Sequence, residues 1–211
     1  MLNKLKIAIT GGIGAGKSEV SKIISAAGYD VLYADEIAKD ILYTDKKIQK
    51  KIIDAFGSKS FDGAKPNKEF LSKIAFSTKE NVEKINSIIH PATLSLISKK
   101  LDEILILKEI AFVESALIYE AKRAKMFDYI IHVYAQENIR IERATKRLNI
   151  SEEEVKDRIS MQLDEEEKRK RADFVLENNS SLDELENKTK FVLHLLNALA
   201  VSKTNENNLE D

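Results

Sequence analysis

The residues with the clearest chemistry in this chain run from Gly11 to Ser18. They read GGIGAGKS, which fits the spacing G-x-x-x-x-G-K-[ST], and they hold four of the chain's 7 glycines within six positions. Glycines at this spacing let successive backbone N–H groups curl around phosphate oxygens, and the helix that follows adds the positive end of its dipole. Lys17 would place an ammonium on the β- and γ-phosphates, and the Ser18 hydroxyl would ligate Mg²⁺. The residues predicted to bind a nucleoside triphosphate are Gly11, Gly12, Ile13, Gly14, Ala15, Gly16, Lys17 and Ser18.

Other interpretations of this loop fit the sequence less well. A glycine-rich turn with an exposed lysine needs no particular context, whereas these residues follow a predicted strand and open a predicted helix. A dinucleotide-binding loop would show G-x-G-x-x-G, which is not matched. A switch GTPase would show Asp-x-x-Gly and Asn-Lys-x-Asp, and the stretch from Asn67 to Phe70 lacks the decisive aspartate. The loop therefore favours another class of P-loop protein.

Asp35 is a second candidate for chemistry. It follows the stretch DVLYA, a predicted strand, so we expect it at the carboxyl end of the sheet, close to the loop. A carboxylate there could accept the proton of an attacking hydroxyl. The ordinary alternative is that Asp35 caps the helix EIAKDIL, and the two roles are compatible.

The elements that must position these residues alternate between strand and helix. Short apolar stretches predict five buried strands, at Leu5–Thr10, Asp30–Ala34, Ile110–Ile118, Tyr129–Ala135 and Phe174–Glu177. Helical patterns lie between and after them, at Lys17–Ala26, Glu36–Leu107, Glu137–Arg171 and Leu182–Val201. This alternation predicts an α/β fold with a parallel five-stranded sheet flanked by helices.

The spacing of the strands also predicts how the chain is divided. The interval between the second and third strands is far longer than a crossover helix needs, so we expect an all-helical insertion at residues 36–107. Residues 138–171 are dense in both charge signs and are predicted to form exposed helices. The remaining residues, 1–35, 108–137 and 172–201, would form the core, followed by a flexible polar tail at 202–211.

Composition limits the class of protein. Charged residues make up 33% of the chain, the net charge is −1, and there are no cysteines. Nothing in this balance favours nucleic acid, a membrane surface or an obligate protein partner, and neither a disulfide framework nor a thiolate metal site can form. The short apolar stretch at the N-terminus does not fit a signal peptide. We expect a cytoplasmic protein that acts on a small molecule.

An ordered set of motifs resembles the dephospho-CoA kinase family over nearly the whole chain. The matching stretches are ITGGIGAGKSEVS, YADEIAKDIL, INSIIHPAT, ALIYEAKRAKMFDYIIHVYA, IRIERATKRLNISEEEVKDRISMQ and EEKRKRADFVLENNSSLDEL. The resemblance implies ATP-dependent phosphorylation of the ribose 3′-hydroxyl of dephospho-CoA, giving CoA and ADP, with Mg²⁺. It also implies a P-loop core, a helical CoA-binding domain and a mobile lid.

The resemblance assigns further roles residue by residue. Asp35 matches the family's proposed catalytic base, and His90, beside Pro91, matches a residue near the acceptor site. Arg143 and Arg147 match lid arginines, and Asn178 matches an asparagine near the adenine of ATP. Ordinary roles stay open for several of them. His90 could be a packed imidazole, Asn178 a turn residue, and the arginines part of a solvated face that pairs with nearby glutamates.

The helix that carries the lid arginines allows one finer prediction. Arg140, Arg143 and Arg147 are spaced i, i+3 and i+7, which puts all three on one face. We expect Arg143 and Arg147 to close over ATP and Arg140 to face solvent.

Two departures from the family pattern lie beside the expected phosphate site. Glu19 stands after Ser18 where the family usually has threonine, and Glu114 stands where it commonly has aspartate. An added methylene at Glu114 leaves a role in positioning Mg²⁺ open.

Two other functions therefore stay in view. One is a different small-metabolite kinase, acting on a nucleoside or nucleotide. The other is a regulator that binds nucleotide without catalysis.

Overall fold

The computed structural model describes residues 4–75 and 77–207, and the chain divides into two compact units. The core unit consists of residues 1–32 and 101–211, and the helical unit runs from Tyr33 to Lys100. The predicted insertion, residues 36–107, covers most of the helical unit. The predicted lid, residues 138–171, belongs to the core unit.

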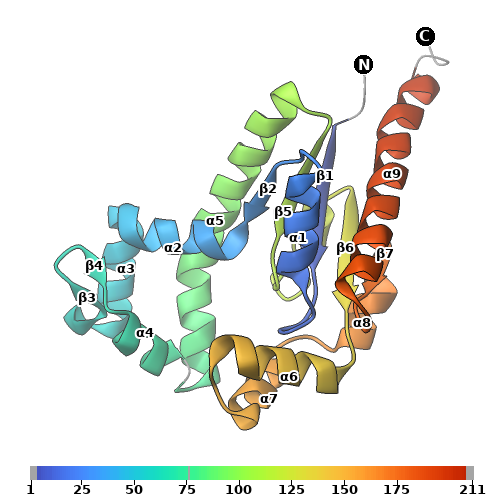
Figure 1. Ribbon diagram of the computed structural model, residues 1–211. Helices are drawn as coiled ribbons and strands as arrows, with labels where there is room; N and C mark the ends of the chain where they lie inside the picture. Colours follow the sequence, from blue (N-terminus) through green and yellow to red (C-terminus); the bar gives the residue numbers. More distant parts are fainter. Residues whose placement is uncertain (1–3, 76, 208–211) are drawn as a thin grey trace. The chain divides into compact units, whose positions relative to one another are not determined.

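A five-stranded sheet forms the centre of the core unit, as the sequence predicts (Figure 1). Its strand order is β2 (Val31–Tyr33), β5 (Ile110–Glu114), β1 (Leu5–Thr10), β6 (Tyr129–Tyr134) and β7 (Phe174–Glu177). The strand β1 pairs in parallel with β5 and β6, and β6 pairs in parallel with β7. The carboxyl ends of the strands therefore meet at one edge of the sheet, where the phosphate loop begins.

Some strand and helix ends differ from the prediction. The third predicted strand was expected to reach Ile118 but ends at Glu114, because Ser115 starts a turn in which its hydroxyl accepts from the backbone N–H of Leu117. The last helix, α9 (Leu182–Asn207), continues beyond its predicted end at Val201. Residues 202–207 of the predicted flexible tail thus continue α9, residues 208–211 lie outside the described part, and the flexibility of the tail stays a prediction.

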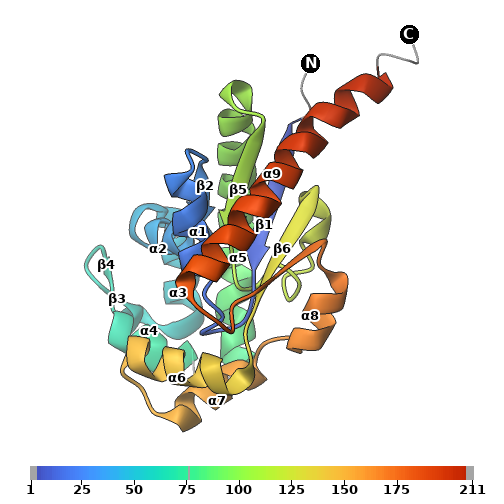
Figure 2. The same ribbon diagram turned by 45° about the vertical axis from the view of Figure 1, so that its right-hand side comes forward.

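Each face of the sheet is covered by different elements. Helices α1 (Lys17–Ala26) and α9 lie side by side on one face in both ribbon views (Figures 1 and 2). These two helices and the sheet bury an apolar cluster, which includes Ile7, Ile9, Val20, Phe112 and Leu196. The opposite face carries a smaller cluster that includes Ala8, Ile118, Tyr119 and Ile130. This alternation along β1 follows from the period of two in a strand.

Three short helices make up the region Glu137–Arg171, where the sequence predicts helices. They are α6 (Glu137–Leu148), α7 (Glu152–Ser160) and α8 (Glu165–Arg171). Asn149 ends α6 in the left-handed conformation, with a φ of 53°. Ser151 then opens α7 with a reciprocal capping box to Glu154, and Asp164 caps α8 by accepting from the backbone N–H of Glu167.

The helical unit contains one element that the sequence did not indicate. Helices α2 (Ala34–Thr44), α3 (Lys46–Phe56) and α4 (Lys68–Ala75), a short 3₁₀ turn at Ser58–Ser60 and the start of α5 (Lys79–Leu107) make up most of it. A two-stranded antiparallel hairpin, β3 (Phe61–Asp62) with β4 (Lys65–Pro66), lies between α3 and α4. The expectation of an all-helical insertion was therefore wrong. Gly63, with a φ of 59°, permits the tight turn of this hairpin.

No helix in the described ranges is both long and apolar enough to cross a membrane.

Candidate active site

The predicted phosphate loop lies between β1 and α1, where its motif requires it to lie. Its glycines allow positive φ values, and they also let neighbouring residues approach the loop backbone closely. Gly14 has a φ of 77°, and a side chain there would collide with the backbone carbonyl of Arg140. A side chain at Gly12 would collide with the Arg140 guanidinium and would come within 2.8 Å of Glu165 Oε1. The loop is therefore tightly packed on its outer side.

Lys17 curls back over the first part of the loop. Its ammonium donates to the carbonyl oxygens of Gly11 at 2.8 Å and Gly12 at 3.1 Å. These two bonds hold the charge beside the helix start of α1, where N–H groups and the helix dipole favour an anion. The contact of Lys17 with bound phosphates stays a prediction.

Ser18 and Glu114 form a pair of oxygen ligands beside the loop. The Ser18 hydroxyl donates to Glu114 Oε1 at 3.2 Å, and Glu114 pairs with Ile9 at the end of the sheet. The second carboxylate oxygen, Glu114 Oε2, is buried and has no hydrogen-bond partner among the described residues. A hydroxyl and a carboxylate with a spare buried oxygen are the hard ligands that Mg²⁺ prefers. The residues present fit this ion, and Glu114, despite its extra methylene, points at Ser18.

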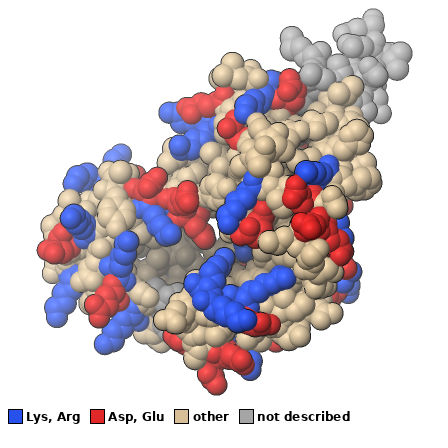
Figure 3. All heavy atoms as spheres, in the orientation of Figure 1, with Lys and Arg blue, Asp and Glu red and all other residues tan. Residues whose placement is uncertain are grey.

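The three arginines of α6 do not share one environment. The guanidinium of Arg143 donates to the backbone carbonyl of Asn178 at 2.9 Å, and Arg147 is exposed. Figure 3 shows Lys and Arg side chains gathered over the region of α6. The prediction that Arg140 faces solvent was wrong, because only 3% of it is exposed. Helical spacing shows which residues share a face but not what packs against that face.

Asn178, which directly follows β7, contacts the loop itself. Its side chain is buried, and Nδ2 donates to the carbonyl of Ala15 at 2.9 Å. It also lies against Gly16, where a side chain would collide with the Asn178 amide. Asn178 is therefore more than a turn residue, since it ties the end of β7 to the phosphate loop. Its contact with adenine stays a prediction.

Sequence analysis missed a set of buried charged side chains next to the loop. Glu165 Oε2 accepts from the backbone N–H of Gly12 at 3.3 Å, and Gln162 Oε1 accepts from that of Ile13 at 3.1 Å. Lys168, with none of its surface exposed, pairs with Glu120 at 2.9 Å and with Glu165 at 3.2 Å. The expectation that this segment is wholly exposed was therefore wrong.

The run EEEKRKR gives no sign of this burial, because charged side chains can be either exposed to solvent or buried in ion pairs. The stretch ISMQ and the stretch EEKRKRAD both lie in motifs that carry the family resemblance. That resemblance was the one available signal for Gln162 and Lys168, whereas Glu165 lies just before the second stretch and had no signal.

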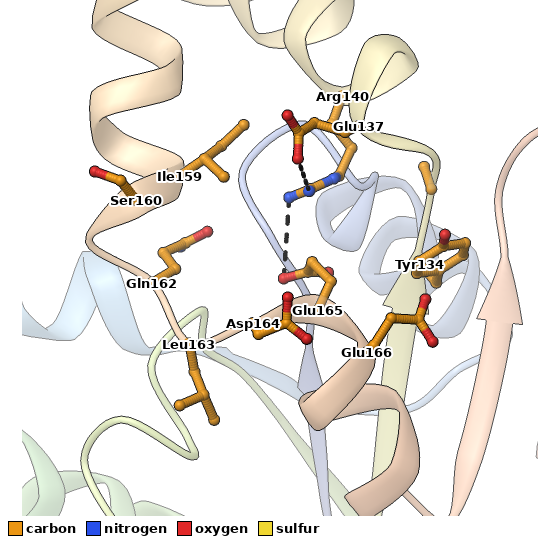
Figure 4. Close-up of a pocket in the computed structure, with 11 residues that line it drawn as sticks. Tyr134, Glu137, Arg140, Ile159, Ser160, Gln162, Leu163, Asp164, Glu165 and Glu166 are labelled. Carbon is orange, nitrogen blue, oxygen red and sulfur yellow. Dashed lines mark ion pairs between the residues drawn. The ribbon is translucent and has the colours of Figure 1, made fainter.

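Glu165 lies among positive neighbours. In Figure 4 the Arg140 guanidinium lies between the carboxylates of Glu137 and Glu165, at 3.8 Å and 3.9 Å. The fully buried imidazole of His132 approaches Glu165 Oε2 at 3.3 Å, poorly aligned for a hydrogen bond. Burial alone would raise the pKa of the Glu165 carboxyl. The adjacent imidazole and the two cations outweigh burial and lower this pKa to about 2.

The two remaining predicted residues lie in the helical unit. Asp35 is exposed in the first turn of α2, and Tyr33 occupies the N-cap position. The alternative that Asp35 caps this helix is therefore wrong. His90 is half-buried in the middle of α5, directly before Pro91. The catalytic role of Asp35 and the substrate contact of His90 stay predictions.

The sheet order, the loop after the central strand and the Ser18–Glu114 pair define a P-loop nucleotide-binding protein of the kinase type. Shikimate kinase from Acinetobacter baumannii shares this fold with a TM-score of 0.53 at 14% identity, covering 92% of this chain and 94% of that one. The chain belongs to the dephospho-CoA kinase family, whose family model matches residues 5–184.

Named relatives agree with this assignment. The dephospho-CoA kinase of Bacteroides fragilis is 38% identical over 83% of this chain and 85% of its own length. That of Fusobacterium nucleatum is 38% identical over 85% of this chain and 92% of its own length. The solved dephospho-CoA kinase from Campylobacter jejuni superposes with a TM-score of 0.63 at 26% identity, covering 90% of this chain and 96% of that one. The match therefore extends over most of the chain.

The charge of Glu165 predicts a pH-dependent stability. Because its pKa falls from 4.5 to about 2 on folding, the folded state binds fewer protons than the unfolded state between these pH values. The carboxylate therefore stabilises the fold above about pH 4.5, and this contribution is lost as the pH falls toward 2. We expect Glu165→Gln to lower the free energy of unfolding at pH 7 by up to about 3 kcal/mol, and by less at pH 3.

Urea denaturation at both pH values measures this difference. Glu167→Gln, the same change at an exposed position of α8, is the control and should alter stability little at either pH. An equal loss for Glu165→Gln at pH 7 and pH 3 would contradict the account.

Proposed function

We propose that this protein transfers the γ-phosphoryl group of ATP to the 3′-hydroxyl of the ribose of dephospho-CoA, giving CoA and ADP. One observation carries the proposal. The match to the dephospho-CoA kinase family spans residues 5–184, and it includes the complete phosphate loop, in which Lys17 donates to the Gly11 carbonyl and Ser18 to Glu114. The regulator that binds nucleotide without catalysis rested on Glu19 and Glu114. Because Glu114 contacts Ser18 despite its extra methylene, its replacement of aspartate no longer supports the regulator, which leaves Glu19 alone.

The phosphate loop would hold the donor. Backbone N–H groups at the start of α1 would bind the phosphate oxygens, and the Lys17 ammonium, held beside the loop by the carbonyls of Gly11 and Gly12, would contact the β- and γ-phosphates. Ser18, with Glu114 beside it, would hold Mg²⁺, which when bound neutralises charge on the phosphate oxygens. These groups fix the γ-phosphoryl group for in-line attack, and such positioning is the main need of phosphoryl transfer.

The acceptor would react with help from the helical unit. The carboxylate of Asp35 takes the proton of the ribose 3′-hydroxyl while the hydroxyl oxygen forms a bond to the γ-phosphorus. The bond from that phosphorus to the bridging oxygen breaks, and ADP leaves with the electron pair. His90 would contact the acceptor, and Arg143 and Arg147 would neutralise charge on the phosphoryl group in transit.

A coupled assay of ADP release tests the proposed function. With ATP and Mg²⁺, dephospho-CoA should support turnover, while a panel of nucleosides and nucleotides should not. Turnover with one of these other acceptors and none with dephospho-CoA would replace the proposal with a nucleoside or nucleotide kinase. ATP binding without turnover of any acceptor would support a non-catalytic regulator.

Asp35→Asn tests the general base. The amide keeps the size of the side chain but cannot accept the proton, so kcat should fall by about 10²–10⁴-fold while ATP affinity is nearly retained. Asp40→Asn, the same change at another exposed position of α2, should retain full kcat. Since Asp35 does not cap α2, its loss should leave the melting temperature unchanged. An Asp35→Asn enzyme with full kcat would rule out the base.

Single alanine variants test the two proposed lid arginines. At saturating ATP, Arg143→Ala and Arg147→Ala should each lower kcat on the scale of an arginine finger, about 10³-fold, with stability almost unchanged. Lys146 lies between them on α6, and 75% of its side chain is exposed. The control Lys146→Ala should change neither kcat nor stability. If both arginine variants turn over at the wild-type rate, these residues belong to a solvated face.

A further inference from the structure

Two consecutive peptide planes at the start of the phosphate loop have hydrogen-bond partners on both sides. In the plane that joins Gly11 to Gly12, the carbonyl accepts from Lys17 at 2.8 Å and the N–H donates to Glu165 at 3.3 Å. In the plane that joins Gly12 to Ile13, the carbonyl accepts from Lys17 at 3.1 Å. The N–H of that second plane donates to Gln162 at 3.1 Å.

This pattern decides on which side of the loop Glu165 and Gln162 lie. In a planar trans peptide the C=O and N–H bonds point in opposite directions. Since both carbonyls point toward the Lys17 ammonium, both N–H groups point away from it. Glu165 and Gln162 therefore bind the outer side of the loop, and do not occupy the side on which Lys17 would contact phosphates.

The charges around Glu165 also fit a supporting role. A lone buried carboxylate next to a triphosphate would repel it. Here the buried carboxylates of Glu165 and Glu120 share the buried Lys168, and Arg140 adds a second cation 3.9 Å from Glu165. The two cations offset the charge of Glu165 and Glu120, and Arg140 also pairs with the exposed carboxylate of Glu137 at 3.8 Å. Glu165 and Gln162 both line a pocket of about 390 Å³ that lies outside the loop (Figure 4).

We propose that Gln162 and Glu165 are positioning residues for Lys17. By holding the N–H groups of Ile13 and Gly12, they keep the opposite carbonyls turned toward the lysine ammonium. Without them, both planes would lose their outer partner, and glycine sets few steric limits to their rotation. The Gly12–Ile13 plane would keep only the bonds of its carbonyl to Lys17 and to the Ala15 backbone N–H, the latter at 3.2 Å. Lys17 would then lose its two anchors, and ATP would have to order the loop as it binds. The inference rests on the proposed function, in which this lysine contacts ATP.

Gln162 provides the sharper test, because it carries no charge and is only half-buried. Gln162→Ala removes the acceptor, whereas Gln162→Glu retains an acceptor oxygen at the same reach. We expect Gln162→Ala to weaken ATP binding by about 10-fold and to raise KM for ATP equally, with KM for dephospho-CoA unchanged. Gln162→Glu should recover most of the affinity. Glu165→Ala should also weaken ATP binding. If this variant does not fold, the comparison of Gln162→Ala with Gln162→Glu tests the inference by itself.

Calorimetry with ATP, steady-state kinetics and amide hydrogen exchange give the readouts. The Ile13 amide should exchange faster in Gln162→Ala than in wild type, and Glu167→Gln should match wild type throughout. Equal rises in both KM values, unchanged ATP affinity or tighter ATP binding in Gln162→Ala would each overturn the inference. Wild-type protein that neither binds ATP nor turns over would instead overturn the proposed function.

Discussion

A strand-to-helix turn binds a triphosphate more tightly when its peptide planes already keep one orientation, because the ligand then does not have to order them. Glycine lets the backbone adopt that turn, but its conformational freedom also lets the backbone adopt other conformations. In this protein the turn between β1 and α1 is held from outside by other parts of the core unit. Arg140 packs against Gly12 and Gly14, and Asn178 binds the carbonyl of Ala15. Three of the four glycines, Gly12, Gly14 and Gly16, thus make room for these supports.

The buried charges beside the loop follow from this arrangement. A side chain that accepts from a loop N–H must be polar, and close packing behind the loop removes it from water. An unpaired buried carboxylate would destabilise the fold, so Glu165 requires the cations of Lys168 and Arg140. The short helix α8 supplies both Glu165 and Lys168 from a sequence that looks fully solvated. The fold and the site therefore depend on the same ion pairs.

The sequence predicted those features that rest on local patterns. The phosphate loop, the strands β1 and β7 and the start of α1 follow from residue type and period, and the structure places them as expected. The burial of Arg140 and Glu165 could not be predicted, because it depends on contacts between residues far apart in the chain. The hairpin at Gly63 was missed because its strands, two residues each, are too short to show a period. The roles of Asp35 and His90 come from the family resemblance and stay predictions.

The central claim is that the loop from Gly11 to Ser18 binds ATP and that Lys17 acts on its phosphates before and during transfer. Calorimetric ATP affinity and kcat of Lys17→Ala, measured together, test this most directly. Lys22→Ala, on the exposed side of the same helix, is the matched control and should behave as wild type. The account predicts that Lys17→Ala loses both affinity and turnover, because the lysine contacts ground state and transition state alike. Wild-type values of both quantities in Lys17→Ala would contradict it.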